Sequence, residues 1–99
     1  MYFIILGTDR AGSGELRQRT RPAHRAYLHG THDGVVLRLA GPTLAADGKT
    51  MTGSMIVVEA QTQDAVERFA SADPYRLADL FETVQIRAWN WTTGNPALP

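Results

Sequence analysis

The alternation of apolar and polar residues predicts four strands in this chain. Residues 2–9 (YFIILGTD) are apolar in both alternating directions, which is typical of a strand buried on both sides in the middle of a sheet. Further strands are predicted at 35–42, 54–60 and 82–91. A polar hairpin loop over 43–53, turning at its Asp-Gly pair, joins the second strand to the third.

A first helix is predicted over residues 15–32, because small or apolar residues recur there at spacings of three and four. This stripe consists of Leu16, Thr20, Ala23, Tyr27 and Gly30. Pro22 has no N–H group and clashes with the preceding turn, so we expect a short turn over 15–20 and a new helix starting near Pro22. His24 falls at the edge of the stripe and is expected to be half-buried.

A second helix is predicted over residues 62–72, with Thr62 as its N-cap. Its inner face is expected to consist of Ala65, Val66, Phe69 and Ala70. The segment that follows places Asp73 directly before Pro74. A carboxylate there accepts hydrogen bonds from the first free N–H groups of a helix that begins at the proline.

The element order β-α-β-β-α-β predicts an α+β, ferredoxin-like fold in which both helices cover one face of a four-stranded antiparallel sheet. The other face carries apolar residues and is expected to be buried against something. We expect a homodimer through this open face; a monomer with an exposed apolar face, or a different partner, are the alternatives. Trp89 and Trp91, on the polar face of the last strand, are assigned to the subunit contact or to a lid.

Length and composition restrict the classes of protein to consider. The 99 residues predict a single domain over 1–99, with a flexible, turn-rich tail at 92–99. Ten basic and ten acidic residues balance, which argues against nucleic-acid binding and against electrostatic attachment to a membrane. The apolar start at 2–6 is too short for a signal core or a membrane span, so a cytoplasmic protein is expected. There is no cysteine for disulfides or thiolate chemistry.

Four short motifs occur in order, with strands of suitable length between them. They are RPAH at 21–24, LAGP at 39–42, TGS at 52–54 and ADPY at 72–75. Together, on this topology, they are similar to the YCII family of small proteins. The resemblance covers about residues 2–91.

The resemblance implies a dimeric α/β-barrel of the ferredoxin-like type. It also implies a site built on a histidine and an aspartate, which match His24 and Asp73 in this sequence. One characterised branch of the family is similar to a dehydrochlorinase that removes HCl from a chlorinated hydroxyhydroquinone. That activity does not transfer to this chain by resemblance alone.

The residues of this pair suit proton transfer. The end of the second helix is expected near the first half of the first helix, which brings His24 and Asp73 within reach of each other or of one ligand. A histidine takes and gives protons near neutral pH, and a carboxylate on its other ring nitrogen orients it. Elimination, isomerisation or tautomerisation would use such a pair. The structural alternatives are that Asp73 only caps a helix and that His24 only packs on Tyr27.

Five further residues are candidates for substrate binding. Arg21 can hold an anionic substrate or form a surface salt bridge. Gly41 and Pro42 are expected to end the second strand and to shape the pocket wall. Ser54 can donate a hydrogen bond to a ligand or be purely structural. Tyr75 can close the pocket with its ring and hydroxyl or serve in packing alone.

Metal and cofactor sites are not expected. His29, His32 and Asp33 lie close together but at a helix end without matching ligands, so we expect them to be solvated. The glycine-rich segment at 7–14 lacks the dinucleotide pattern and the P-loop lysine. The leading hypothesis is therefore a cofactor-independent lyase or isomerase acting on a small polar or aromatic molecule. The alternatives are a non-catalytic small-ligand-binding or accessory module and a cofactor-free monooxygenase acting on a quinol.

Overall fold

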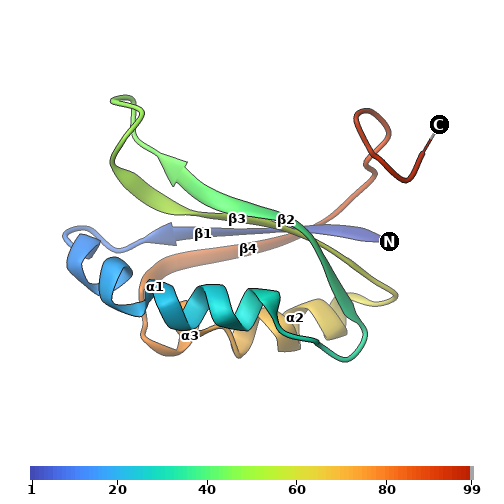
Figure 1. Ribbon diagram of the computed structural model, residues 1–99, viewed down its shortest axis with the longest axis horizontal. Coiled ribbons are helices and arrows are strands. Elements are labelled where there is room, and N and C mark those ends of the chain that lie inside the picture. The colour runs from blue at the N-terminus through green and yellow to red at the C-terminus, as the bar shows by residue number, and fades with distance from the viewer. Residues whose placement is uncertain (99) are drawn as a thin grey trace.

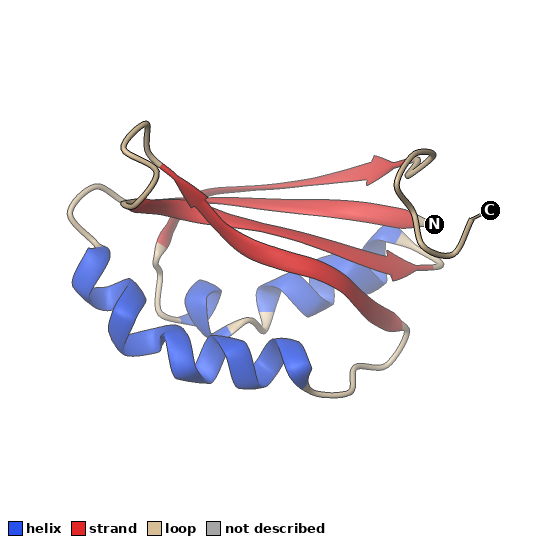
Figure 2. Cartoon of the chain, turned by 45° about the horizontal axis from the view of Figure 1, so that its top comes forward, coloured by secondary structure: helices blue, strands red, loops and turns tan. Residues whose placement is uncertain are grey.

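A computed structural model describes residues 1–98, in which a curved sheet lies over a layer of helices (Figure 1). Figure 2 shows that the helices all cover the same face of the sheet. The elements in chain order are β1 (Tyr2–Asp9), α1 (Gly14–His29), β2 (Val35–Leu44), β3 (Met51–Ala60), α2 (Gln63–Ser71), α3 (Pro74–Leu77) and β4 (Phe81–Trp89).

The sheet has the strand order β2-β3-β1-β4, and each neighbouring pair is antiparallel. The predicted α+β, ferredoxin-like fold is therefore confirmed. The strand at the N-terminus lies between β3 and β4, as its two-sided apolar pattern predicts. Its odd-numbered residues Phe3 and Ile5 are buried under the helices, while Ile4 and Leu6 point to the open face and are half-buried.

The core lies between the sheet and the helices. Its larger cluster consists of Phe3, Ile5, Leu28, Val35, Ile56, Val58, Ala60, Val66 and Phe69. A smaller cluster of Tyr75, Leu80 and Phe81 packs at the end where α3 and β4 meet. Burial of these side chains provides most of the stabilisation and fixes α1 over β2 and β3, which form the walls of the site described below.

The predicted division of the first helix is wrong. The helix α1 runs without interruption through Pro22, although the proline removes one backbone hydrogen bond. Figure 2 shows that the helix axis bends along its length instead of breaking. The predicted inner stripe is also partly wrong, because Ala23 and Gly30 are exposed, whereas Arg17 and His24 are buried.

The hairpin between β2 and β3 has longer strands than predicted. The strand β2 continues through Gly41 and Pro42 to Leu44, so these two residues do not end it. Proline is tolerated because β2 is an edge strand, which makes ladder hydrogen bonds on one side only. The predicted turn is confirmed: the Asp47 carboxylate accepts hydrogen bonds from the N–H groups of Lys49 and Thr50.

Both predicted helix caps are confirmed. The Thr62 hydroxyl accepts a hydrogen bond from the backbone N–H of Ala65 at the start of α2. The Asp73 carboxylate accepts one from the backbone N–H of Tyr75, 2.9 Å away, at the start of α3. These caps satisfy N–H groups that have no partner inside their own helices.

The chain after β4 lies against the first strand. The Asn95 side chain donates hydrogen bonds to the Tyr2 hydroxyl and to the Trp91 carbonyl. The Trp91 ring stacks on Trp89 and meets Tyr2 edge to face. Whether the predicted tail is flexible stays a prediction. None of the helices in residues 1–98 has the length and apolar character needed to span a membrane.

Candidate functional site

His24 and Asp73 form a direct contact between α1 and the start of α3. The His24 Nδ1 atom lies 2.8 Å from an Asp73 carboxylate oxygen, and the two residues are only 7% and 2% exposed. A carboxylate only accepts hydrogen bonds, so Nδ1 carries the proton and Nε2 is left as the free ring nitrogen. The predicted proximity is confirmed, and Asp73 is at the same time the predicted helix cap.

The Tyr75 ring supports His24 from one side. The two rings stack with centroids 3.9 Å apart and an angle of 19° between their planes. His24 therefore packs on Tyr75 and not on Tyr27, as its structural alternative expected. Behind Tyr75, the ring of Phe81 meets it edge to face. Phe81 fits there because position 7 is glycine: a Cβ on Gly7 would lie 2.6 Å from the Phe81 ring.

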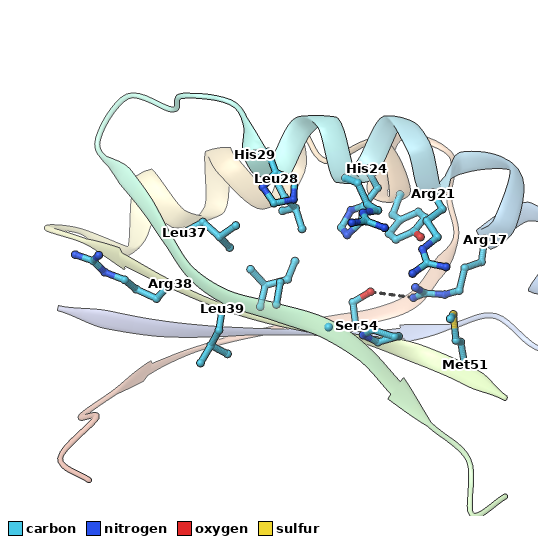
Figure 3. A pocket seen from close by; sticks show the side chains of 16 residues that line it. Arg17, Arg21, His24, Leu28, His29, Leu37, Arg38, Leu39, Met51 and Ser54 are labelled. Atoms are coloured by element: carbon cyan, nitrogen blue, oxygen red, sulfur yellow. Dashed lines mark hydrogen bonds between the residues drawn. The ribbon is translucent and has the colours of Figure 1, made fainter. Parts of the chain in front are cut away.

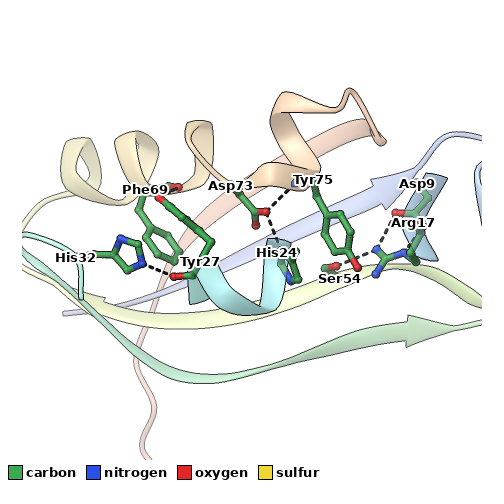
Figure 4. A network of polar contacts seen from close by, with 9 residues as sticks. All are labelled: Asp9, Arg17, His24, Tyr27, His32, Ser54, Phe69, Asp73 and Tyr75. Atoms are coloured by element: carbon green, nitrogen blue, oxygen red, sulfur yellow. Dashed lines mark hydrogen bonds and ion pairs between the residues drawn. The ribbon is translucent and has the colours of Figure 1, made fainter. Parts of the chain in front are cut away.

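A second buried ion pair lies on the other side of Tyr75 (Figure 4). Arg17, 3% exposed, donates two hydrogen bonds to the Asp9 carboxylate at 2.6 and 2.9 Å. It donates a third to the Ser54 hydroxyl at 2.9 Å. The guanidinium carbon of Arg17 also lies 4.6 Å from the centre of the Tyr75 ring, within cation–π distance.

The charges around Tyr75 act on the pKa values of both Arg17 and Tyr75. Burial works against the charged guanidinium, but the hydrogen bonds and the charge of Asp9 outweigh it and raise the pKa of Arg17. Burial raises the pKa of the Tyr75 phenol above its ordinary value, although the positive charges of Arg17 and Arg21 oppose the shift. Arg17 is therefore charged and Tyr75 neutral at physiological pH.

These groups border a cavity of about 430 Å³ between α1 and the strands β2 and β3 (Figure 3). It is lined by Arg17, Arg21, His24, Arg25, Leu28, His29, Leu37, Arg38, Leu39, Ala40, Gly41, Pro42, Met51, Ser54, Ile56 and Tyr75. One wall is thus apolar, and the α1 side is cationic. A cavity of this size accommodates a small ring or a short acid.

The structure brings the predicted site residues together. Six of the seven line the cavity: Arg21, His24, Gly41, Pro42, Ser54 and Tyr75. Asp73, the seventh, is not among the lining residues; it is buried and contacts Nδ1 of His24. The Ser54 hydroxyl oxygen accepts a hydrogen bond from Arg17, so the hydroxyl proton of Ser54 remains available for donation to a ligand. The roles of these residues in binding or catalysis stay predictions.

Sequence reasoning missed Arg17, Arg25 and Asp9. Arg17 lies four residues before Arg21 on α1, and Arg25 lies four residues after it. This spacing places the three arginines on one helix face. Asp9 continues the odd-numbered, helix-facing positions of β1. These spacings were visible in the sequence, but charged residues are by default assigned to solvent.

The expectation of solvated side chains near the end of α1 is confirmed for His29 and Asp33, which are exposed, and is wrong for His32. His29 is exposed and lines the cavity. His32 is half-buried: its ring contacts Tyr27 and Phe69, and its Nε2 lies 2.6 Å from the Tyr27 carbonyl oxygen. Within residues 1–98, no three histidine, aspartate or glutamate side chains gather in a way that suits a metal ion.

Solved structures provide one comparison. The 5-chloro-2-hydroxyhydroquinone dehydrochlorinase TftG from Burkholderia phenoliruptrix AC1100, in complex with 2,5-dihydroxybenzoquinone, is similar with a TM-score of 0.80 and 37% sequence identity. The match covers 91% of this chain and 94% of TftG. MhuD with manganese protoporphyrin IX has a TM-score of 0.53 at 15% identity, which indicates the fold alone.

Curated sequences give the second comparison. Protein YciI from Escherichia coli O6:H1 is 37% identical over 92 residues, which cover 88% of this chain and 94% of that protein. An uncharacterized protein from Haemophilus influenzae is 28% identical over a stretch of the same length and coverage. The model of the YCII-related domain matches residues 1–90. The chain therefore belongs to the YCII family.

Proposed function

We propose that this protein is a cofactor-independent enzyme that moves a proton on a small hydroxylated or keto-bearing ring, in an elimination or isomerisation. The observation that carries the proposal is the contact of His24 Nδ1 with Asp73 at the wall of the cavity. It directs the Nδ1–H of His24 to the carboxylate and leaves Nε2 as the ring nitrogen that exchanges a proton with a bound molecule. Similarity to TftG, whose structure holds a dihydroxybenzoquinone, supports the choice of a ring.

Each group at the site has a role in this proposal. His24 is the general acid and base, and Asp73 holds its tautomer and stabilises the imidazolium that forms. The Tyr75 ring restricts His24 to one orientation by stacking. Arg17 and the Ser54 hydroxyl lie side by side at the cavity wall and stabilise negative charge on an oxygen of the ring.

An elimination of HCl balances with these groups alone. One ring hydroxyl of a chlorinated trihydroxybenzene loses its proton while the chlorine-bearing carbon gains one, which gives the keto tautomer of the ring. A second ring hydroxyl then loses its proton to a base, its electron pair shifts through the ring, and the C–Cl pair leaves with chloride. The product is a hydroxyquinone, and the redox change is internal to the ring.

The test follows proton transfer directly. The ring hydrogens of 2,5-dihydroxybenzoquinone exchange with solvent deuterium only if a ring carbon gains and loses a proton, which NMR detects. We expect the protein to accelerate this exchange and to release chloride from 5-chloro-2-hydroxyhydroquinone. The variant His24→Gln should lower both rates by about 10²–10⁴-fold.

His32→Gln is the matched control, because it makes the same substitution at a histidine eight residues further along the chain that does not line the cavity. The proposal is wrong if the wild-type protein exchanges no faster than buffer, or if His24→Gln equals the wild type. Tight retention of the unaltered quinone without exchange would instead support the binding-module alternative. Oxygen consumption during turnover would indicate the monooxygenase alternative.

We also infer that a second copy of the chain covers the open face of the sheet. Ile4 and Leu6 point to this face from β1, and the exposed Leu39 and Trp89 extend it across both edge strands. Leu39 is among the residues that line the cavity, but Figure 3 shows its side chain directed away from the helices. Light scattering should give the mass of two chains for the wild type and of one chain for Leu39→Glu, with unchanged circular dichroism.

A further inference from the structure

The helix α1 presents a row of three arginines to the cavity. Arg17, Arg21 and Arg25 follow one another at four-residue spacing, and all three line the cavity. Figure 3 shows Arg21 directed toward the space above Arg17 and Ser54. No aspartate or glutamate is among the lining residues in the described part of the chain. The chain as a whole is neutral, so this charge is local.

The arginines of the cavity differ in whether a carboxylate already neutralises them. Arg17 is paired with Asp9, and Arg38 with Glu59. None of the ion pairs within residues 1–98 includes Arg21 or Arg25.

The two uncompensated guanidinium groups repel each other. Like charges four residues apart destabilise a helix by a small amount, and solvent screens part of this repulsion because both side chains are exposed. An anion bound between the two groups relieves this repulsion. The two neighbouring charges therefore destabilise the free protein slightly and favour binding of an anion.

The neighbouring groups restrict the shape of that anion. Arg21 and Arg25 are one helical turn apart, about 6 Å along the axis, so their planar forks can meet one carboxylate from two sides. His24 lies between them in sequence, and its ring stacks on Tyr75 deeper in the site. Leu28, with β2 and β3 opposite, provides an apolar wall on which a ring can lie.

We propose that Arg21 and Arg25 anchor a carboxylate, and that the substrate class is therefore a small hydroxylated ring acid whose ring lies against His24 and Tyr75. This inference deepens the proposed function and rests on it for the word substrate. The binding preference itself does not require turnover.

A pair of probes that differ by one group tests the anchor. We would measure by calorimetry the binding of 2,5-dihydroxybenzoate and of hydroquinone, which has the same two hydroxyl groups without the carboxylate. The wild type is expected to bind the acid at least about 10-fold more tightly, because hydrogen bonds between ions are the strong ones. Arg21→Gln and Arg25→Gln should each remove most of this preference.

Arg19→Gln is the matched control, because Arg19 is on the same helix, is exposed, and does not line the cavity. It should keep the preference. Equal binding of the two probes by the wild type, binding of neither, or an equal loss in Arg19→Gln would overturn the anchor. Inorganic phosphate serves as a further probe: binding as tight as that of the acid would show a general anion site and also overturn a ring-acid class.

Two readouts separate this inference from its neighbours. Arg21→Gln is expected to leave the ligand-free melting temperature unchanged or higher, whereas a purely structural arginine would lower it. His24→Gln is expected to keep the preference for the acid. If deuterium exchange fails while the preference for the acid persists, the proposed catalysis is wrong and the anchor stands.

Discussion

Two buried pairs of a cationic or basic side chain with a carboxylate lie on either side of Tyr75, and they differ in what they can do (Figure 4). Arg17 and Asp9 are joined by two hydrogen bonds, and Ser54 takes a third. His24 and Asp73 are joined by one contact, and the imidazole retains a free nitrogen.

This difference shows which pair has a fixed charge and which pair can transfer a proton. The charge on an arginine does not change near neutral pH, so the first pair provides fixed charge at the cavity wall and transfers no proton. A histidine changes its charge in the physiological range, so the second pair can give and take a proton. Tyr75 contacts both: its ring stacks on His24 and lies against the Arg17 guanidinium.

The largest effect is expected from breaking the fixed pair. Arg17→Met leaves Asp9 as a buried charge without its partner, which should lower the free energy of unfolding by about 3–5 kcal/mol in urea denaturation. The control is Arg10→Met. Arg10 pairs with Asp79 at the surface, where the side chains are 50% and 78% exposed, so its loss should cost about 0–1 kcal/mol.

A second variant keeps the first prediction decisive if the single variant does not fold. The double variant Arg17→Met/Asp9→Leu removes both charges and should recover a large part of the lost stability. Equal losses for Arg17→Met and Arg10→Met would mean that the buried pair contributes no more than a surface pair. The Arg17–Asp9 pair would then not be a structural requirement of the site.

A smaller effect is expected from separating the two roles of Asp73. Asparagine caps a helix about as well as aspartate, so Asp73→Asn should cost less stability than Asp73→Ala, which loses about 0.5–2 kcal/mol with the cap. One Asp73 oxygen both faces Nδ1 and accepts from the Tyr75 N–H, so an asparagine that keeps the cap still offers an acceptor to Nδ1, whereas Asp73→Ala removes cap and acceptor together.

Nitrogen NMR of the imidazole reads this tautomer directly. The wild type and Asp73→Asn should show neutral His24 protonated at Nδ1, and Asp73→Ala, which lacks the acceptor, a larger share protonated at Nε2. An unchanged tautomer in Asp73→Ala would show that the carboxylate does not orient the ring, and that Asp73 serves as a cap alone.

The sequence predicts those features of the structure that depend on local pattern, and it fails for those that depend on tertiary packing. The order of strands and helices follows from apolar periodicity, because a buried face must repeat with its element. The meeting of His24 with Asp73 follows from the topology, since the end of α2 has to approach α1. The same patterns give both caps, because an N-cap is a local interaction.

The errors have a common cause in packing that local rules do not contain. Pro22 is accommodated within α1 by a bend, at a cost that the contacts of the helix with the core offset. The strand β2 tolerates Pro42 only because it is at an edge, which depends on the whole sheet. Arg17 is buried because Asp9, far away on β1, receives it. No helical stripe of apolar residues predicts such a partner.

The smallest effect concerns Tyr75, the residue shared by the two pairs, and is expected at alkaline pH. Burial, together with the negative charges of Asp73 and Asp9, raises the pKa of the Tyr75 phenol above its ordinary value of 10.0, against the opposing effect of Arg17 and Arg21. The folded protein therefore holds the proton where the unfolded chain has lost it. This contribution to stability is complete below pH 10 and decreases as the pH rises from there through the folded-state pKa.

Tyr75→Phe removes this titration while keeping the ring that stacks on His24. We expect the free energy of unfolding of the wild type to fall more steeply above about pH 10 than that of the variant, measured by urea denaturation across pH 8–11. Tyr27, whose pKa burial also raises, adds a similar slope of its own, so Tyr27→Phe is the matched comparison. Identical slopes for Tyr75→Phe and the wild type would mean that the phenol ionises as freely in the folded chain as in the unfolded one. The Tyr75 hydroxyl would then be in contact with solvent, and the ring would not shield the two pairs beside it from water.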